Sequence, residues 1–323
     1  KNVILTRNAI CGGVESIIKV EAELLDADVI VCGGLDYKEL APFEYVRADN
    51  REDLLKQLVN YSLIIYHWIP DYAVKAVAET KIPSIEFVHR TDTNDCDKSV
   101  PSAVVTHSKF LGEYIFSTSG VRCDIIDHPI DTDIFVPAES LGKYIGGITS
   151  YYDVKGIDVF IRAWAKIKDE FPSIKARFYG KGLDLEKFQK LSKKLNADIE
   201  FLSATTMPEI KLRDFCLVVC PSRCEGLPVV ILEALAMNIP VIASNLDGMM
   251  EFKKTAQFQG YDDIITLTKQ EDPLILAGAM KRQLKGNYRQ NTRDFIKKFY
   301  SKENHIMGLK KVIDKIIMAK RDI

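Results

Sequence analysis

The stretch that decides the fold is CPSRCEGLPVVILEALAMNIPVIAS, residues 220–244. An apolar, β-branched run leads into it and predicts a buried strand, which ends before the turn Gly226-Leu227-Pro228. The Ala- and Leu-rich run after the turn predicts a helix, with Pro228 in its first turn. A second buried strand is predicted from Pro240. A strand, a tight turn, a helix and a strand in this order are typical of a parallel α/β sheet.

Two acidic residues of this stretch, Glu225 and Glu233, have seven residues between them. A strand-to-helix turn presents free backbone N–H groups and the positive end of a helix dipole, so it favours binding of a phosphate group. Carboxylates beside such a turn can accept hydrogen bonds from the hydroxyls of a sugar and a ribose. The stretch therefore suggests a site for a phosphate-linked sugar.

Length and composition predict an ordinary globular protein. A chain of 323 residues suggests about two domains. A net charge of -1 does not favour a general nucleic-acid-binding surface. No apolar run reaches the roughly 18–20 residues of a membrane span, and the first residues do not read as a signal peptide. We expect a cytoplasmic protein.

The cysteines predict reduced thiols and no metal site. Their odd number, without a secretory signal, favours the cytosol. Three of them recur at four-residue intervals, whereas zinc sites favour C-x2-C pairs, so we expect two small hydrophobic side chains in a buried strand and one cysteine in a loop instead. The seven positions are Cys11, Cys32, Cys96, Cys123, Cys216, Cys220 and Cys224.

Strand and helix patterns alternate along the whole chain, which predicts an α/β protein of two Rossmann-like domains. The first domain is predicted over residues 1–138 and the second over 139–300, and residues 301–323 are predicted to form a C-terminal helix. Ligands of such sheets bind at the carboxyl ends of the strands. Gly12, Gly13, His67 and His89 lie at such ends in the first domain.

Five segments resemble, in order and spacing, the motifs of glycosyltransferase family 4, whose members are retaining enzymes with the GT-B fold. Residues 221–244 resemble its E-x7-E signature. The others are CGGVESIIKVEAELL (residues 11–25), PIDTDIFVP (129–137), GITSYYDVKGIDVFIRAWAKI (147–167) and DGMME (247–251, a loop in the family). The resemblance spans residues 3 to 252 and implies two Rossmann-like domains facing across a cleft.

The resemblance also implies roles for single residues. Glu225 would contact the transferred sugar, Glu233 would hold the ribose hydroxyls, and Lys155 would neutralise the departing diphosphate. His89 would lie near the sugar; the alternative is a strand-end histidine without a ligand. For His67 a packing role is favoured. The remaining residues expected to bind the nucleotide-sugar are Gly12, Gly13, Gly226, Leu227, Pro228 and Val229.

By this resemblance the protein transfers a hexose or a related sugar from a nucleotide-sugar, UDP- or GDP-linked, to a growing surface polysaccharide or a lipid-linked glycan. Neither a cofactor nor a metal is expected, and Asp131-Thr132-Asp133 is interpreted as part of the linker. A glycosidase carboxylate pair is disfavoured, because the nucleotide-sugar frame explains both glutamates. The alternatives are a non-catalytic carbohydrate- or nucleotide-binding module of a larger glycan-assembly protein and a nucleotide-sugar epimerase.

One departure from the family pattern concerns charge. The family pairs Lys155 with an Arg after the preceding strand, and Gly147 stands where that Arg is expected. Lys181, Arg223 or a nest of backbone N–H groups could replace it.

The basic tail has two interpretations. Residues 281–323 hold 13 Lys and Arg against 4 Asp and Glu, and apolar residues recur at helical spacing from Ile306. The apolar stripe is expected to dock on the first domain, as the last helix does in the family. Outward lysines could then also contact an anionic membrane at its inner face.

Overall fold

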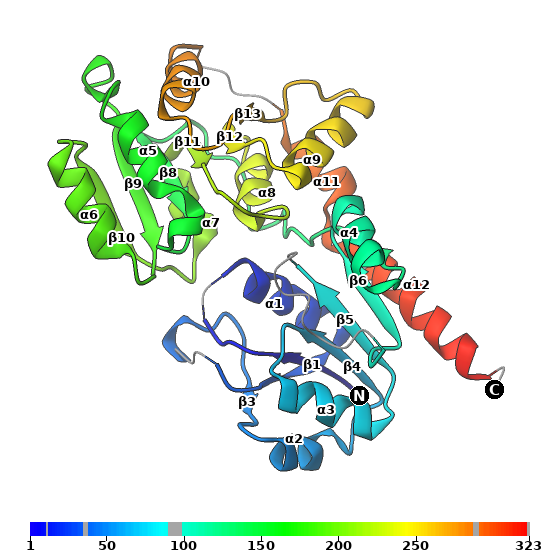
Figure 1. Ribbon diagram of the computed structural model, residues 1–323. Helices are drawn as coiled ribbons and strands as arrows, with labels where there is room; N and C mark the ends of the chain where they lie inside the picture. The colour runs from blue at the N-terminus through cyan, green and yellow to red at the C-terminus, as the bar shows by residue number, and fades with distance from the viewer. Residues whose placement is uncertain (11, 35–37, 90–98, 287–290, 322–323) are drawn as a thin grey trace. The chain divides into compact units, whose positions relative to one another are not determined.

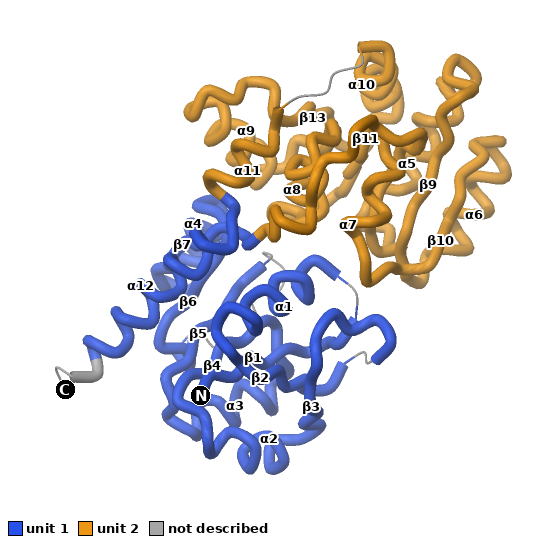
Figure 2. Tube along the Cα trace, turned by 180° about the vertical axis from the view of Figure 1, so that it is seen from behind, with its two compact units in different colours: residues 1–129, 300–323 blue, residues 130–299 orange. Residues whose placement is uncertain are grey.

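The computed structural model describes residues 1–10, 12–34, 38–89, 99–286 and 291–321. The chain forms two compact units (Figure 2): unit 1 comprises Lys1–Pro129 and Tyr300–Ile323, and unit 2 comprises Ile130–Phe299. The sequence predicts the boundary later, at residue 138. The linker joins unit 2 earlier because the Arg293 guanidinium donates hydrogen bonds to the carbonyl oxygens of Thr132 and Phe135, at 2.6 and 2.5 Å.

Unit 1 contains a parallel sheet of seven strands in the order β3-β2-β1-β4-β5-β6-β7 (Figure 1). Its central strands are apolar on both sides, as expected where helices cover both faces of a sheet. Their bounds are β1 Asn2–Thr6, β2 Ala27–Val31, β3 Val46–Arg47, β4 Leu63–His67, β5 Ser84–Val88, β6 Ala103–Thr106 and β7 Asp124–Ile125.

Helices cover both faces of this sheet. Because successive strand residues point to opposite faces, Val3 and Leu5 pack with α2 and α3, whereas Ile4 packs with α1 and α12. Leu309, Val312 and Ile316 anchor α12 in that second core. The helices are α1 Gly13–Leu25, α2 Arg51–Leu58, α3 Asp71–Thr80, α4 Lys109–Ser119 and α12 Lys302–Arg321.

Unit 2 contains a parallel sheet of six strands in the order β10-β9-β8-β11-β12-β13. Counted within the unit, the order is the 3-2-1-4-5-6 of doubly wound α/β folds, and unit 1 has the same order with a seventh strand added. The strand order reverses between β1 and β4 in unit 1 and between β8 and β11 in unit 2. The bounds are β8 Tyr144–Ile148, β9 Lys175–Gly180, β10 Ile199–Ser203, β11 Phe215–Cys220, β12 Val241–Ser244 and β13 Thr266–Thr268.

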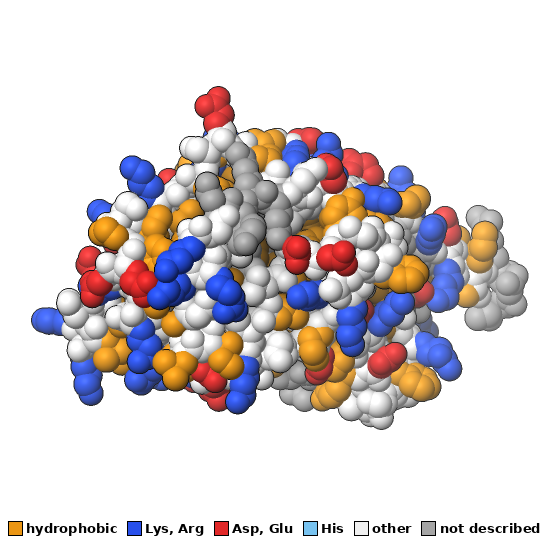
Figure 3. Space-filling model, turned by 90° about the horizontal axis from the view of Figure 1, so that it is seen from above, with side chains coloured by type: hydrophobic (Ala, Val, Ile, Leu, Met, Phe, Trp, Pro, Cys, Tyr) orange, Lys and Arg blue, Asp and Glu red, His pale blue; other side chains and the backbone are white. Residues whose placement is uncertain are grey.

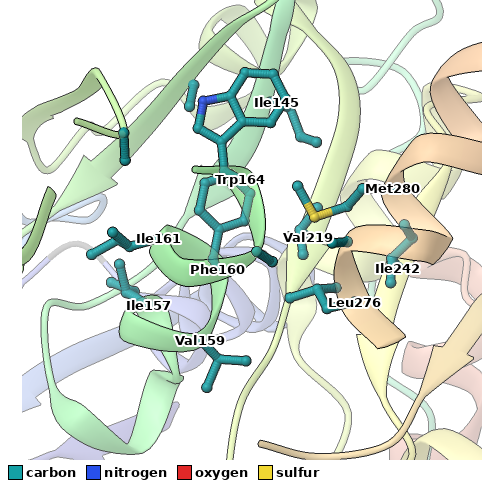
Figure 4. Close-up of a cluster of buried hydrophobic side chains, with 14 of the residues drawn as sticks. Ile145, Ile157, Val159, Phe160, Ile161, Trp164, Val219, Ile242, Leu276 and Met280 are labelled. Carbon is teal, nitrogen blue, oxygen red and sulfur yellow. The ribbon is translucent and has the colours of Figure 1, made fainter. Parts of the chain in front are cut away.

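The main core of unit 2 lies between the sheet and α5, α6 and α10, with Trp164, Phe160 and Met280 at its centre (Figure 4). On the sequence pattern, α5 is expected to continue to about Phe171, but it ends at Trp164, and a separate 3-10 turn spans Lys168–Glu170. The helices are α5 Ile157–Trp164, α6 Leu185–Lys194, α7 Pro208–Lys211, α8 Val229–Ala236, α9 Asp247–Phe258, α10 Pro273–Gly286 and α11 Arg293–Phe299.

The surface carries charges of both signs. On the face shown in Figure 3, Lys and Arg side chains lie interspersed with acidic and apolar ones. In the described ranges, none of the helices has the length and apolar content needed to cross a membrane.

The docking of α12 predicts a stability difference between two of its residues. Leu309 is fully buried, whereas Met307 is 52% exposed. Leu309→Ala should lower the free energy of unfolding by about 3 kcal/mol, because it leaves a cavity in the core. Met307→Ala should change it by less than about 0.5 kcal/mol. Urea unfolding followed by circular dichroism measures both, and equal effects would contradict the docking described above.

Candidate active site

Two turns of unit 2 meet at the carboxyl ends of β8 and β11, where the strand order reverses. The first turn, Asp153–Lys155, is a single 3-10 turn that ends at Gly156 with φ of 64°. A Cβ at Gly156 would overlap the carbonyl oxygen of Pro221 in the second turn. The Arg223 N–H also donates to the Val154 carbonyl at 2.8 Å. Lys155 is therefore fixed beside the loop that carries Glu225.

Lys155 and Glu225 form an ion pair between the Lys155 Nζ and the Glu225 Oε1. The Ser222 hydroxyl donates a second hydrogen bond to the same oxygen at 3.2 Å. Both members of the pair are mostly buried, with 19% and 11% of their side chains exposed. The predicted sugar-contacting carboxylate and the predicted phosphate-binding lysine are thus brought together.

Arg223 holds the turns in place and is not available to a ligand phosphate. Its guanidinium donates two parallel hydrogen bonds to the Asp158 carboxylate, at 2.9 and 3.1 Å, and one to Glu271 at 2.7 Å. A fourth goes to the Asp153 carbonyl at 2.5 Å. Its bonds to Asp158 raise the pKa of Arg223 above its ordinary value. The sequence suggests Arg223 as a possible second cation for the diphosphate. In the structure Arg223 does not supply it.

Gly147, where the sequence predicts the missing cation, lies inside strand β8 rather than after it. The strand β8 continues to Ile148, which pairs in register with Tyr179 of β9, so Gly147 lies inside the strand and is buried. A Cβ there would contact the Val218 side chain at 3.7 Å rather than reach the end of the sheet. The first residues after the strand are Thr149 and Ser150.

The start of α8 offers backbone N–H groups near the ion pair. Pro228 precedes the helix with ψ of 127°, so it is not part of the first turn as the sequence predicts, and Val229 is the first helical residue. In the described part of the chain, no backbone acceptor outside the helix bonds the N–H groups of Val229 and Val230. The Gly226 carbonyl lies against Gly248, where a Cβ would overlap it. Helix α9 therefore supports the loop, and DGMME is helical rather than a loop.

Glu233 lies one turn further along α8 and is 5% exposed. Burial raises the pKa of its carboxyl to about 8, and Glu209 adds to the effect. Among the described residues, no hydrogen bond to this carboxyl contributes to its pKa, so nothing offsets the cost of burying its charge. A ligand with hydroxyl groups would provide the missing bonds.

In unit 1, Gly12 and Gly13 begin α1 after β1. Gly12 caps the helix in an extended conformation, and a Cβ there would lie 2.5 Å from the Glu15 Oε2. Gly12 therefore makes room for the Glu15 carboxyl, which burial holds at a pKa of about 7. Gly13 is exposed at the first position of the helix.

His89 directly follows β5, and His67 ends the neighbouring strand β4. The His67 Nδ1 and the His89 Nε2 are 2.9 Å apart, and the His67 Nε2 is 2.8 Å from the Glu21 Oε2. Burial and the neighbouring His67 and His128 lower the pKa of His89 well below its ordinary value. His67, expected to have a packing role, instead links His89 to a buried carboxylate.

His67 and His89 belong to a buried cluster of histidines around the Glu21 carboxylate, called the histidine cluster below. Its other members, which sequence reasoning missed, are Glu21, His107, His128 and His305. A signal was present, because histidines 67, 89, 107 and 128 occur once per successive strand of the sheet, each at or just after its carboxyl end. Burial alone would raise the pKa of Glu21, but its interactions with His67 and His305 lower it to about 2.

A metal site is not formed by the part of the chain that the structure describes: no group of three His, Cys, Asp or Glu side chains is arranged to hold an ion. Asp131, of the linker tripeptide, accepts a hydrogen bond from the Asp133 N–H at 3.0 Å, which is a local turn.

Comparisons with known proteins find a family match within unit 2. Residues 142–285 match the sequence model of a family described as Glycosyl transferases group 1. An uncharacterized glycosyltransferase of Methanocaldococcus jannaschii is 25% identical over 277 residues, which cover 79% of this chain and 75% of that protein. One of Haemophilus influenzae is 24% identical over 213 residues, 62% of this chain and 58% of that protein. The chain thus spans less than two thirds of the Haemophilus relative.

Solved structures show the fold of both units. HepE of Anabaena in complex with UDP-glucose aligns over 100% of both chains with a TM-score of 0.76 and 14% identity. Sucrose-phosphate synthase of Thermosynechococcus elongatus aligns over 99% of this chain and 100% of that chain with a TM-score of 0.73 and 15% identity. The fold is therefore GT-B, and residues 142–285 match the model of the glycosyl transferases group 1 family.

The contact between Gly156 and Pro221 predicts a stability difference between two left-handed glycines. Gly120 has φ of 73° and open space around its Cβ position, so Gly120→Ala should cost about 1 kcal/mol, from backbone conformation alone. Gly156→Ala adds a backbone clash and should cost at least about 2 kcal/mol more than Gly120→Ala, because backbone is harder to displace than a side chain. Unfolding in urea measures both free energies. Equal costs would show that the two turns are not in contact.

Proposed function

We propose that the protein is a retaining, metal-independent glycosyltransferase that moves a sugar from a UDP-sugar to a hydroxyl of a growing polysaccharide or a lipid-linked glycan. The observation that carries the proposal is the arrangement around one turn of unit 2: the Lys155–Glu225 pair, the open start of α8 and the buried Glu233. The UDP complexes of HepE support a uridine nucleotide.

The nucleotide-sugar diphosphate is proposed to bind Lys155 and the N–H groups at the start of α8. A helix N-terminus favours anions through its unpaired N–H groups and its dipole. Without nucleotide, Lys155 is neutralised by Glu225. Diphosphate binding therefore requires Lys155 to exchange one anionic partner for another, which releases Glu225 to accept hydrogen bonds from the hydroxyls of the transferred sugar.

The chemical step needs no protein nucleophile. The acceptor hydroxyl oxygen forms a bond to the anomeric carbon on the face from which the diphosphate departs, and the bond from that carbon to the diphosphate oxygen breaks. The acceptor proton passes to a phosphate oxygen of the leaving group. Lys155 stabilises the charge that develops on the diphosphate, Glu225 orients the sugar, and His89 contacts a sugar hydroxyl.

Unit 1 is proposed to provide the acceptor side, while its Gly12 and Gly13 bind the nucleotide-sugar and His89 contacts a hydroxyl of the transferred sugar. Helix α12 of this unit buries Leu309 and exposes Lys310 and Lys311. This arrangement is compatible with contact between the exposed lysines and an anionic membrane surface on the cytoplasmic side, where a lipid-linked acceptor would be reached.

Removing the sugar-orienting carboxylate should abolish transfer. Glu225→Gln should lower kcat by about 100-fold or more, because it removes a charged contact to the sugar in the transition state. Lys155→Ala should instead weaken UDP binding by tenfold or more, as expected for loss of a charge-assisted bond. Lys187→Ala is the matched control, since this exposed lysine pairs with Asp153 of the same turn. Sugar transfer and calorimetric binding measure these effects.

The outcomes separate the candidate functions. Full turnover by the Glu225→Gln protein would refute the assignment. Binding of UDP-sugars with neither transfer nor hydrolysis would favour the non-catalytic module, and conversion of the sugar without an acceptor would favour an epimerase.

Nucleotide binding should release a proton from Glu233. Its carboxyl has a pKa of about 8 in the ligand-free protein, and ribose hydroxyls donate to the ionised form, so binding should lower that pKa. The affinity for UDP should therefore rise as pH increases from 6 to 8 and level off above it. Calorimetry at pH 7 in two buffers of different ionisation enthalpy measures the released proton. The Glu233→Gln protein should not release this proton when UDP binds. An unchanged proton release by this variant would contradict the role of Glu233.

A further inference from the structure

All five histidines of the chain lie together in unit 1. The His89 ring is 5.1 Å from that of His67 and 4.9 Å from that of His107. The His107 and His128 rings are 3.8 Å apart, and His305 reaches the cluster from α12, with its ring 6.0 Å from that of Phe87. The hydrogen bonds within this cluster determine where its protons are.

His305 must carry a proton on both ring nitrogens. Its Nδ1 is 2.7 Å from the carbonyl oxygen of Asp127, which can only accept a hydrogen bond. Its Nε2 is 2.9 Å from the Glu21 Oε1, and the other Glu21 oxygen is 2.8 Å from a nitrogen of His67, so both oxygens of this carboxylate accept hydrogen bonds from imidazole rings. His305 is therefore an imidazolium, and it balances the charge of Glu21 at a site that is closed to solvent.

His67 is then neutral, with its proton on Nε2. That nitrogen donates to the Glu21 Oε2 at 2.8 Å. A second proton on His67 would place an unbalanced positive charge on a side chain with no solvent exposure, beside a carboxylate already paired with His305. The His67 Nδ1 therefore carries a lone pair and accepts a hydrogen bond from the His89 Nε2–H at 2.9 Å.

His89 is the end of this chain of hydrogen bonds. The groups that face it are His67, His107, His128 and, through His67, the Glu21 carboxylate. Burial and the neighbouring rings disfavour its charged form. With the proton on Nε2, the His89 Nδ1 is a hydrogen-bond acceptor, and no described residue bonds it.

We propose that Glu21, His67 and His305 are positioning residues that hold His89 in one neutral tautomer, so that its Nδ1 accepts a hydrogen bond from a ligand hydroxyl. The identity of the ligand group, a sugar hydroxyl, rests on the proposed function. The proton positions rest on the hydrogen bonds alone. The last helix thereby determines whether His89 acts as an acceptor or a donor.

The proton positions are measured directly by nitrogen NMR of the whole protein labelled in its histidines. At pH 7 we use the long-range spectrum that correlates the ring nitrogens with the carbon-bound ring protons. It should show His305 protonated on both nitrogens. His67 and His89 should be protonated on Nε2 only, and His107, which donates from Nδ1 to the Ile126 carbonyl at 2.6 Å, on Nδ1 only. A His89 protonated on Nδ1, or on both nitrogens, would overturn the proposal, whether or not the protein transfers a sugar.

The variant His305→Gln tests the consequence. Without the imidazolium, the proton that balances Glu21 should move to His67, whose Nδ1–H then donates to the His89 Nε2 and shifts the His89 proton to Nδ1. Transfer should lose about tenfold in kcat, on the order of one hydrogen bond, while UDP affinity stays unchanged. Lys315→Gln is the control on the same helix, because it removes only the exposed pair with Asp124.

A shifted His89 proton with unchanged kcat would show that the tautomer does not matter, and an unshifted proton would show that His305 does not set it; either result overturns the proposal. If His305→Gln fails to fold, His67→Phe keeps the ring stacked on Phe87, 4.8 Å away in the native protein, and removes the acceptor of the His89 Nε2–H. That variant should show a mixture of His89 tautomers and a loss of kcat in proportion to the fraction protonated on Nδ1, and an unchanged kcat with a mixture present would overturn the proposal.

Discussion

Parallel strand pairing is the constraint on which the rest of the structure depends. When all strands of a sheet run in one direction, their carboxyl ends share one edge, and the loops that leave this edge are brought together whatever their separation in the sequence. Lys155 and Glu225 are 70 residues apart and still form an ion pair, because β8 and β11 are neighbours in the sheet. The histidines of unit 1 meet for the same reason, one strand at a time.

Buried carboxylates behave in opposite ways in the two units. Glu21 is closed to solvent but paired with two histidines, and its pKa falls to about 2. Glu233 is buried with no such partner among the described residues, and its pKa rises to about 8. The difference lies in the hydrogen-bond donors around each group rather than in burial, which raises the pKa in both cases. A carboxylate with its donors in place is part of the scaffold, whereas one without them is prepared for a ligand.

Much of the fold and of the nucleotide half of the candidate site could be predicted because the signals are local. The run from Cys220 to Ser244 contains the strand, the turn, the helix and both glutamates in consecutive residues. The role of Arg223 could not be predicted, since its partners Asp158 and Glu271 are placed beside it only by the folded sheet. The end of β8 could not be predicted either. It depends on the register of β8 with β9, through Ile148 and Tyr179, and a pattern of Gly and Ile residues does not show register.

The contact between Glu21 and His305 spans 284 residues and therefore affects the order of folding. Domains generally fold in the order in which they leave the ribosome. In this chain, α1 emerges early with a carboxylate whose balancing charge arrives only after all of residues 130–299 have been synthesised. Until then unit 1 has an incomplete core and Glu21 has only one of its two histidine partners, His67, whereas unit 2 has all of its own strands. The nascent chain should therefore complete its second unit first.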